Sequence, residues 1–244
     1  MAGIYLHIPF CKQACHYCDF HFSTNRSRQA EMVEALSKEL ALRSRELNGE
    51  VVETIYFGGG TPSLLTKQEI EQLLHQVQEK FTLHPEPEIT LEANPDDLDP
   101  IKLEEIKASH INRLSIGIQT FDDDRLKFIN RAHSREEALA CLTNARRVGF
   151  DNISADLIYA LPPDDLAYWE RDLDQLIEFD LEHLSLYGLT IEEKTVFGKW
   201  RQKEKLKEVP ENTAATQYEL AIERMKAAGF QHYEVSNFCK PGFH

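Results

Sequence analysis

The chain has neither an even number of cysteines nor a long apolar stretch. Its 244 residues include five cysteines, an odd number, so a full set of intramolecular disulfides is excluded. The first residues lack the charged start and apolar run of a secretory signal peptide, and no segment is apolar over the length that a bilayer requires. We therefore expect a cytoplasmic protein with reduced cysteines and no transmembrane segment.

Positive charge is also scarce. The 27 Lys and Arg residues stand against 41 Asp and Glu residues, which gives a formal net charge of −14. Such a surface repels phosphate backbones, so we expect no nucleic-acid partner. A basic stretch at residues 199–207 contains Trp200 and Glu204, and this mixed pattern favours a solvated helix face over a binding patch.

Internal repeats, low-complexity tracts and Gly/Ser linkers are absent, and an apolar content of 42% suits one α/β core. Strand-like segments alternate with amphipathic helical segments, which is typical of βαβ units around a parallel sheet. Thr66 with Glu69, and Ser134 with Glu137, predict the starts of two helices as capping boxes. The strands are expected at residues 4–8, 53–57, 88–92, 113–118, 152–158 and 183–189.

Six βα units fit either an open doubly wound sheet or a partial barrel. Both folds bind ligands at the carboxyl ends of their strands, and this is where polar residues and glycines gather in this sequence. Beyond the cysteines that follow the first strand, the set comprises Gly58, Gly59, Gly60, Thr61, Glu92, Asn94, Gln119, Arg131 and Asp156.

Two members of this set carry a specific expectation. The glycines lack the Gly-Lys-Ser/Thr ending of a phosphate loop, so they indicate close approach of the backbone to some other ligand. Asp156 interrupts an apolar run, and a carboxylate inside a buried strand costs several kcal/mol unless it is paired. We therefore expect a partner or a ligand for Asp156, with Arg131 and Gln119 as the obvious donors.

Three cysteines, Cys11, Cys15 and Cys18, form a Cys-x3-Cys-x2-Cys loop directly after the first predicted strand. Soft thiolates select iron–sulfur clusters or zinc. A closed [4Fe–4S] cluster takes four cysteines, so three leave one iron open to a small molecule. A zinc site would need a fourth ligand, and no second Cys-x2-Cys knuckle accompanies the loop. The candidates for that ligand are His7, His16, His21 and Asp19.

Three further residues are expected to have structural rather than chemical roles. His7 is interpreted as a hydrogen-bonded core histidine. Cys141 shares an apolar helical stripe and is predicted to be a small core residue. Cys239 is expected in a turn, with no assignable role.

Seven motifs, in order along nearly the whole chain, resemble those of the oxygen-independent coproporphyrinogen III oxidase family of radical S-adenosylmethionine (SAM) proteins. The resemblance implies a partial TIM-like (β/α)6 barrel over residues 1–195, followed at 196–244 by the start of a C-terminal extension that is cut short. The motifs are His7-Ile-Pro-Phe-Cys11 with Cys15 to Cys18, Phe57-Gly-Gly-Gly-Thr-Pro62, Glu92-Ala-Asn-Pro95, Gly117-Ile-Gln-Thr-Phe121, Asn130-Arg-Ala-His133, Asp156-Leu-Ile-Tyr-Ala-Leu-Pro162 and Tyr233-Glu-Val-Ser-Asn-Phe238.

The resemblance also implies a set of binding residues. The three cysteines of the loop hold a [4Fe–4S] cluster, whose open iron takes SAM. The residues that resemble contacts to this SAM are Tyr5, Tyr17, Gly59 and Glu92. Those that match positions where the oxidase binds a second SAM are Gly60, Thr61, Gln119, Arg131 and Asp156.

Two departures separate the chain from the oxidase. Phe20 stands where the oxidase has a fourth cysteine, and only four residues precede Tyr5, where the oxidase has a long arm. Both features resemble the haem chaperone branch of the family, whose members are thought to pass haem to haem-requiring respiratory proteins. Haem is then the expected cargo, and a flavodoxin- or ferredoxin-type protein the expected reductant.

The haem-associated motif of the family would fall just beyond His244, so the haem ligand is not expected among these residues. The alternative function is oxidative decarboxylation of coproporphyrinogen III. Whether the chain is an enzyme therefore stays open.

Overall fold

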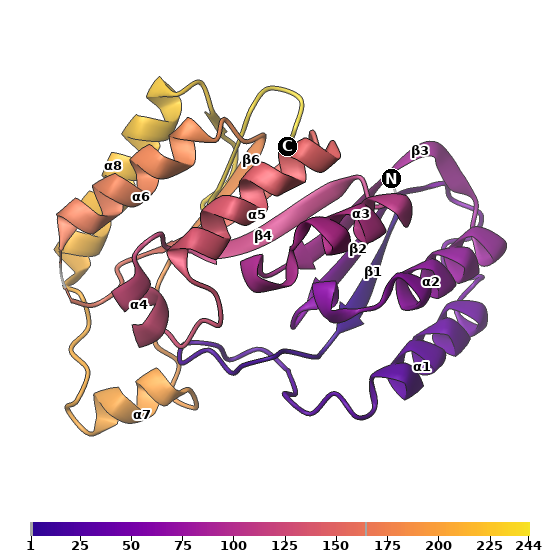
Figure 1. The fold of residues 1–244 in the computed structure, drawn as a ribbon, viewed down its shortest axis with the longest axis horizontal. Coiled ribbons are helices and arrows are strands. Elements are labelled where there is room, and N and C mark those ends of the chain that lie inside the picture. Colours follow the sequence, from indigo (N-terminus) through magenta and orange to yellow (C-terminus); the bar gives the residue numbers. More distant parts are fainter. Residues whose placement is uncertain (1, 164) are drawn as a thin grey trace.

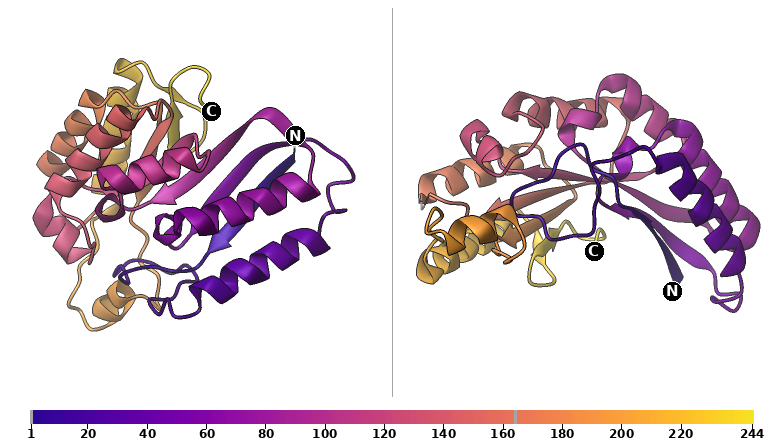
Figure 2. Two further views of the ribbon diagram at one scale, coloured as in Figure 1. Left: turned by 45° about the vertical axis from the view of Figure 1, so that its right-hand side comes forward. Right: turned by 90° about the horizontal axis from the view of Figure 1, so that it is seen from below.

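The computed structural model describes residues 2–163 and 165–244. One curved sheet of eight strands forms its centre, and helices cover the convex face, as the end-on view in Figure 2 shows. The strands lie in the order β1-β2-β3-β4-β5-β6-β8-β7 (Figure 1). They span Ala2–Ile8 (β1), Val52–Gly59 (β2), Leu83–Ala93 (β3), Arg113–Gln119 (β4), Ile153–Tyr159 (β5), His183–Gly188 (β6), Gln231–His232 (β7) and Asn237–Cys239 (β8).

The first six strands are parallel, and from β1 to β5 each pairs with the next strand along the chain. A doubly wound sheet would reverse its strand order at a switch point, and this sheet does not. The sheet is therefore a partial (β/α)6 barrel, which confirms the predicted fold class and resolves the alternative that the strand pattern left open. All six strands occur where the sequence predicted them.

Local sequence signals explain where several helices begin. The side chain of Thr66 accepts a hydrogen bond from the amide of Glu69 at the start of α2, and the Glu69 carboxylate bonds back to the Thr66 amide. Ser134 and Glu137 do the same before α5. Both predicted capping boxes are confirmed. The helices span Gln29–Leu42 (α1), Lys67–Lys80 (α2), Pro100–Ala108 (α3), Asp123–Phe128 (α4), Arg135–Val148 (α5), Leu166–Glu178 (α6), Val196–Gln202 (α7) and Glu211–Ala227 (α8), with short 3-10 turns at Pro62–Leu64 (η1) and Pro95–Asp97 (η2).

The core lies between the sheet and its helices. Strand β4 is buried along nearly its whole length, as expected for a parallel strand that helices cover. Cys141 is buried on α5 among Ala138, Leu142 and Ala145, so its predicted core role is confirmed. No helix of the described residues is long and apolar enough to cross a membrane.

The last strands continue the sheet in the opposite direction. β8 pairs antiparallel with β6, and Cys239 lies opposite His183. The prediction of a turn at Cys239 is therefore wrong: its apolar thiol is fully buried in the strand that covers the edge of β6. The helix predicted over the basic stretch also differs, because α7 ends at Gln202 and residues 203–207 lie beyond it.

Candidate functional site

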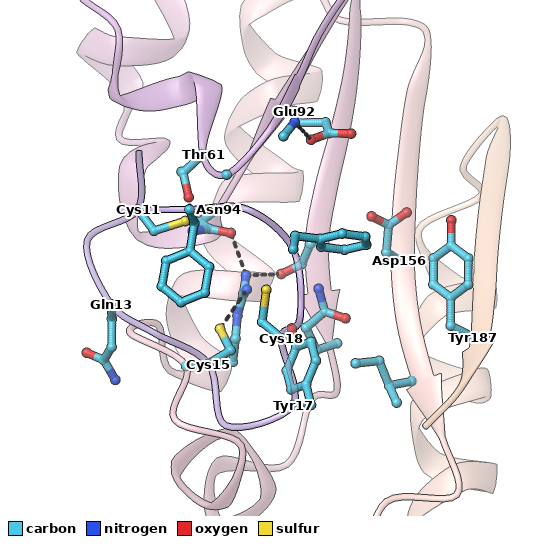
Figure 3. Close-up of a pocket in the computed structure, with 18 of the residues that line it drawn as sticks. Cys11, Gln13, Cys15, Tyr17, Cys18, Thr61, Glu92, Asn94, Asp156 and Tyr187 are labelled. Atoms are coloured by element: carbon cyan, nitrogen blue, oxygen red, sulfur yellow. Dashed lines mark hydrogen bonds between the residues drawn. The ribbon is translucent and has the colours of Figure 1, made fainter. Parts of the chain in front are cut away.

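A cavity of about 380 Å³ opens at the carboxyl ends of the parallel strands. Figure 3 shows the sulfur-bearing side chains of Cys11, Cys15 and Cys18 on one side of it, with Asp156 and Tyr187 on the other. Every residue that the family resemblance assigns to a binding site lines this cavity, with the exception of Tyr5. That set is Cys11, Cys15, Tyr17, Cys18, Gly59, Gly60, Thr61, Glu92, Gln119, Arg131 and Asp156.

The cysteine loop is fixed by residues that follow α4. The side-chain amide of Asn130 donates to the carbonyl of Ala14 at 2.7 Å, and the amide of Gln13 donates to the Asn130 side-chain oxygen at 2.8 Å. The backbone amide of His16 donates to Ile129 O at 3.0 Å. Asn130 has a φ of 59°, a left-handed conformation that asparagine tolerates better than most residues. These hydrogen bonds hold the loop between Cys11 and Cys18.

A second anchor comes from the end of β3. The ammonium group of Lys12 lies 2.8 Å from the carboxylate of Asp96 and also pairs with Asp97, both in η2. The Asp97 carboxylate accepts a hydrogen bond from Ser63 in η1 as well. This network joins the cysteine loop to the turns that follow β2 and β3.

The thiols lie in a partly buried, mostly neutral setting. Burial raises the pKa of Cys11 and of Cys18, and the positive charge of Arg131 opposes that rise. Among the residues that line the cavity, Arg131 is the single cation, beside two carboxylates. A cationic ligand or metal would therefore favour the thiolate forms.

Arg131 is held from three directions. Its guanidinium nitrogens lie 3.6 Å from the Cys15 sulfur, 2.5 Å from the side-chain oxygen of Asn94 and 2.7 Å from the carbonyl of Gly117. Its Nε atom is buried and has no hydrogen-bond partner in the part of the chain that the structure describes. The guanidinium therefore faces one of the cavity's sulfurs from a fixed position.

Glu92 is oriented by two hydrogen bonds. One carboxylate oxygen accepts from the Tyr56 hydroxyl at 2.8 Å, and the other accepts from the Gly59 amide at 2.9 Å. Burial raises the pKa of Glu92, while both hydrogen bonds oppose the rise. Tyr5, which is 56% exposed, lies outside the cavity lining and stacks on Tyr56 with ring centroids 5.9 Å apart. Tyr5 therefore borders the site through its contacts with Tyr56 and His7 rather than from the cavity lining itself.

Asp156 lies beside Ser185 across the β5–β6 pair. Burial raises the pKa of Asp156 to about 7, although a hydrogen bond with Ser185 opposes the shift. Its Oδ1 atom is buried and has no hydrogen-bond partner among the described residues. The expected donors Arg131 and Gln119 line the same cavity, and the positive charge of Arg131 opposes the rise in the pKa of Asp156. Neither forms a hydrogen bond with Asp156 among the described residues, and the guanidinium donates to Asn94 and Gly117 instead. Asp156 is thus a buried carboxyl group that lacks a full set of partners.

Two glycines bring the backbone close to the cysteine loop. A Cβ atom on Gly60 would lie 2.7 Å from the carbonyl oxygen of Phe10 and 3.0 Å from the sulfur of Cys11. Gly59 has a φ of 119°, and a Cβ there would lie 2.7 Å from the His7 ring. Only glycine fits at either position without displacing its neighbours. The part of the cavity next to Gly60, here called its floor, therefore has no room for a side chain between the backbone and the cysteine loop.

Some residues of the site were not found from the sequence. Tyr56, which orients Glu92, looked like an ordinary strand residue. Tyr187 at the end of β6 lines the cavity, and it would have been found by applying the strand-end rule to the sixth strand. His7 matches its prediction only in part: its Nδ1 lies 3.2 Å from the Tyr5 hydroxyl, but it is half-buried and its Nε2 has no partner among the described residues.

Comparison with known proteins identifies the class of protein. Residues 5–176 match the Radical SAM superfamily, and the chain belongs to that superfamily. This membership implies a [4Fe–4S] cluster and SAM as cofactors.

More particular similarities run along almost the whole chain. The chain is 38% identical to "Heme chaperone HemW" of Bacillus subtilis, an alignment that covers 99% of this chain and 64% of the relative. It is 36% identical to the protein of the same name from Escherichia coli, over 99% of this chain and 63% of the relative. The chain thus spans less than two thirds of the length of these relatives.

A solved structure gives the same picture. The chain superposes on coproporphyrinogen III oxidase (HemN) from Escherichia coli, described as a radical SAM enzyme, with a TM-score of 0.87 and 27% identity. That match covers 98% of this chain and 56% of the oxidase. The expected resemblance to this family is confirmed.

The residues around the cavity fit an iron–sulfur cluster. A [4Fe–4S] cluster bonds each thiolate to a different iron, so its cysteines need not converge on one point. No group of three or more His, Cys, Asp or Glu side chains in the described part of the chain is placed to hold a metal ion by itself. The cavity instead suits a [4Fe–4S] cluster, which is larger than a single ion. Three thiols surround a floor that excludes side chains, and a fixed cation lies beside one sulfur.

Proposed function

We propose that the chain forms the barrel of a cytoplasmic haem chaperone, which binds haem and delivers it to haem-requiring respiratory proteins. The observation that carries the proposal is the 38% identity, over 99% of this chain, to a relative named as a heme chaperone. Residues 196–244 would then begin the C-terminal extension of the complete protein, and the haem ligand would lie outside the present chain.

In this proposal Cys11, Cys15 and Cys18 hold a [4Fe–4S] cluster. When bound, the cluster and SAM together supply one-electron chemistry that generates a carbon radical. Gly60 lets the backbone approach the bound groups, since no side chain separates it from the loop, and Gly59 packs against the His7 ring.

The polar residues would orient SAM. Glu92 is pre-positioned by Tyr56 and the Gly59 amide, so its carboxylate can accept hydrogen bonds from an ammonium group or a ribose. Tyr5 and Tyr17 would flank this SAM. A second SAM would contact the remaining set: Gly60, Thr61, Gln119, Arg131 and Asp156.

The second candidate function is oxidative decarboxylation of coproporphyrinogen III, which the TM-score of 0.87 to the oxidase favours. Phe20 is the observation against it. This side chain lines the cavity and is 75% exposed, and it stands where the oxidase family has a fourth cysteine.

The experiment that separates the two functions uses the full-length gene product, reconstituted anaerobically. The protein is incubated with SAM, a low-potential reductant and coproporphyrinogen III, and loss of carboxyl groups is followed by mass spectrometry. In parallel, haem-loaded protein is mixed with a haem-free respiratory haem protein, and transfer is followed by absorbance. We expect haem transfer without decarboxylation, and decarboxylated product would establish the oxidase instead.

The cluster assignment has its own test in Cys15→Ala. We expect this variant to lose the brown iron–sulfur absorbance and its bound iron, whereas Cys141→Ala, a change buried in α5, should retain both. Full iron content in Cys15→Ala, or zinc in place of iron in the parent protein, would refute the assignment.

A further inference from the structure

Helix α7 packs directly on the cysteine loop. The amide of Phe197 donates to the carbonyl of His16 at 3.0 Å, and the His16 ring meets the Trp200 ring edge-on at a centroid distance of 4.9 Å. His16 lies between Cys15 and Cys18 in sequence. Figures 1 and 2 both show α7 next to this loop. A molecule bound at α7 would therefore be separated from the cysteines by little more than one layer of side chains.

The segment that carries α7 has a charge opposite to that of the chain. Residues 194–207, here called the basic segment, contain six Lys or Arg residues and one carboxylate, Glu204, in a chain with a net charge of −14. Glu192, Glu193 and Glu208 flank the segment, so the stretch 192–208 still has two more cations than carboxylates. Arg201 pairs with Glu208. Within the described residues, no carboxylate lies at ion-pair distance from the other five cations, all of them exposed: Lys194, Lys199, Lys203, Lys205 and Lys207.

Unpaired, exposed cations on an acidic protein suit an acidic partner. Complementary charge raises the rate of encounter and orients the partner, while the rest of this surface would repel it. The segment offers no exposed apolar anchor for a membrane, because Phe197 and Leu206 are buried and Trp200 packs on His16. Its place beside the cysteine loop distinguishes it from a general nucleic-acid patch.

We propose that the basic segment is the docking surface for an acidic one-electron donor protein that reduces the cluster. The inference rests on the proposed function, since it requires the cluster. In the reduction one electron leaves the donor, whose redox centre is oxidised by one electron, and the cluster gains that electron. No bond is made or broken. The contacts of His16 with Trp200 and Phe197 join the docking surface to the loop.

The test measures anaerobic reduction of the reconstituted full-length protein by stopped-flow absorbance, with reduced flavodoxin as donor and with dithionite as a small reductant. The variant is Lys199→Glu/Lys203→Glu. The matched control, Lys38→Glu/Lys80→Glu, makes the same change of net charge on the exposed faces of α1 and α2.

We expect the second-order rate constant with flavodoxin to fall about 10- to 100-fold at low ionic strength in the α7 variant, and to approach the parent value in high salt. The rate with dithionite should stay unchanged, and the control should remain within about threefold of the parent.

An unchanged flavodoxin rate, in a variant that dithionite reduces normally, would overturn the docking surface and leave the proposed function intact. Absence of a reducible cluster in the parent would overturn both. If the α7 variant instead loses affinity for RNA or for anionic vesicles while its flavodoxin rate is unchanged, the segment serves that other class of partner and the inference is wrong.

Discussion

Replacing Asp156 by asparagine should stabilise the protein while it impairs the site. The pKa of Asp156 is about 7 in the folded protein, because of burial, against an ordinary value of 3.8. The folded state therefore resists ionisation of this group, whereas the unfolded chain ionises near pH 4. Below about pH 4 both states carry the proton, and the group costs nothing. The cost grows between pH 4 and pH 7 and is complete above pH 7.

The size of the effect follows from the shift. Three pKa units correspond to about 4 kcal/mol at 1.36 kcal/mol per unit. The carboxyl group borders the cavity and keeps part of its hydration, so we expect about half of this, about 2 kcal/mol. Asparagine preserves the shape of the side chain without the charge. Asp156→Asn should then raise the free energy of unfolding of the cluster-free protein by about 2 kcal/mol at pH 8 and leave it nearly unchanged at pH 4.

The assay is urea denaturation across this pH range, with SAM binding measured by calorimetry on the reconstituted protein. Asp172→Asn is the matched control. Asp172 is buried on α6 and lines a different cavity, and burial raises its pKa to about 6. It should also stabilise the protein at pH 8, but without loss of SAM binding. A stability difference for Asp156→Asn that does not depend on pH would refute the reasoning. Unchanged SAM binding would show that the Asp156 carboxyl group does not contact SAM.

Three further changes probe the same cavity. Gly60→Ala should lower the iron content several-fold with little change in circular dichroism, because its Cβ would press on Phe10 O and the Cys11 sulfur; full iron content would contradict the floor described above. Tyr56→Phe removes the hydrogen bond that the tyrosine hydroxyl donates to Glu92, worth about 1.5 kcal/mol, so calorimetry should show SAM affinity about tenfold lower. Arg131→Gln removes a positive charge beside a cluster sulfur. If that charge stabilises the reduced cluster by about 1.4 kcal/mol, the midpoint potential of this one-electron couple should fall by about 60 mV in an EPR-monitored titration. An equal or higher potential would count against that contact.

Much of the fold could be predicted because its signals are local. Apolar runs of strand length marked β1 to β6, and the capping boxes at Thr66 and Ser134 marked two helix starts. The site followed from topology, since the carboxyl ends of parallel strands meet at one end of a barrel. That rule brought Gly59, Glu92 and Asp156 together without knowledge of any contact.

The rest depended on pairings that no local pattern encodes. Arg131 was expected to serve Asp156, but hydrogen bonds to Asn94 and Gly117 turn it toward Cys15. Cys239 was expected in a turn, but it lies in β8, which pairs antiparallel with the edge of β6. In both cases the residue type indicated the kind of contact that the side chain would make. Which of several chemically suitable partners it contacts depends on the tertiary packing.

The anchors of the cysteine loop have a consequence for the order of events during synthesis. Gln13 and Ala14 are tied to Asn130, 117 and 116 positions later, and His16 is covered only when Phe197 and Trp200 arrive. Since a chain emerges from its N-terminus, the three thiols leave the ribosome long before the residues that hold their loop. Early in translation they belong to an unconstrained segment, open to oxidation or to stray metals. Insertion of the iron–sulfur cluster therefore depends on timing as well as on geometry. It is favoured after the later strands and α7 have folded against the cysteine loop.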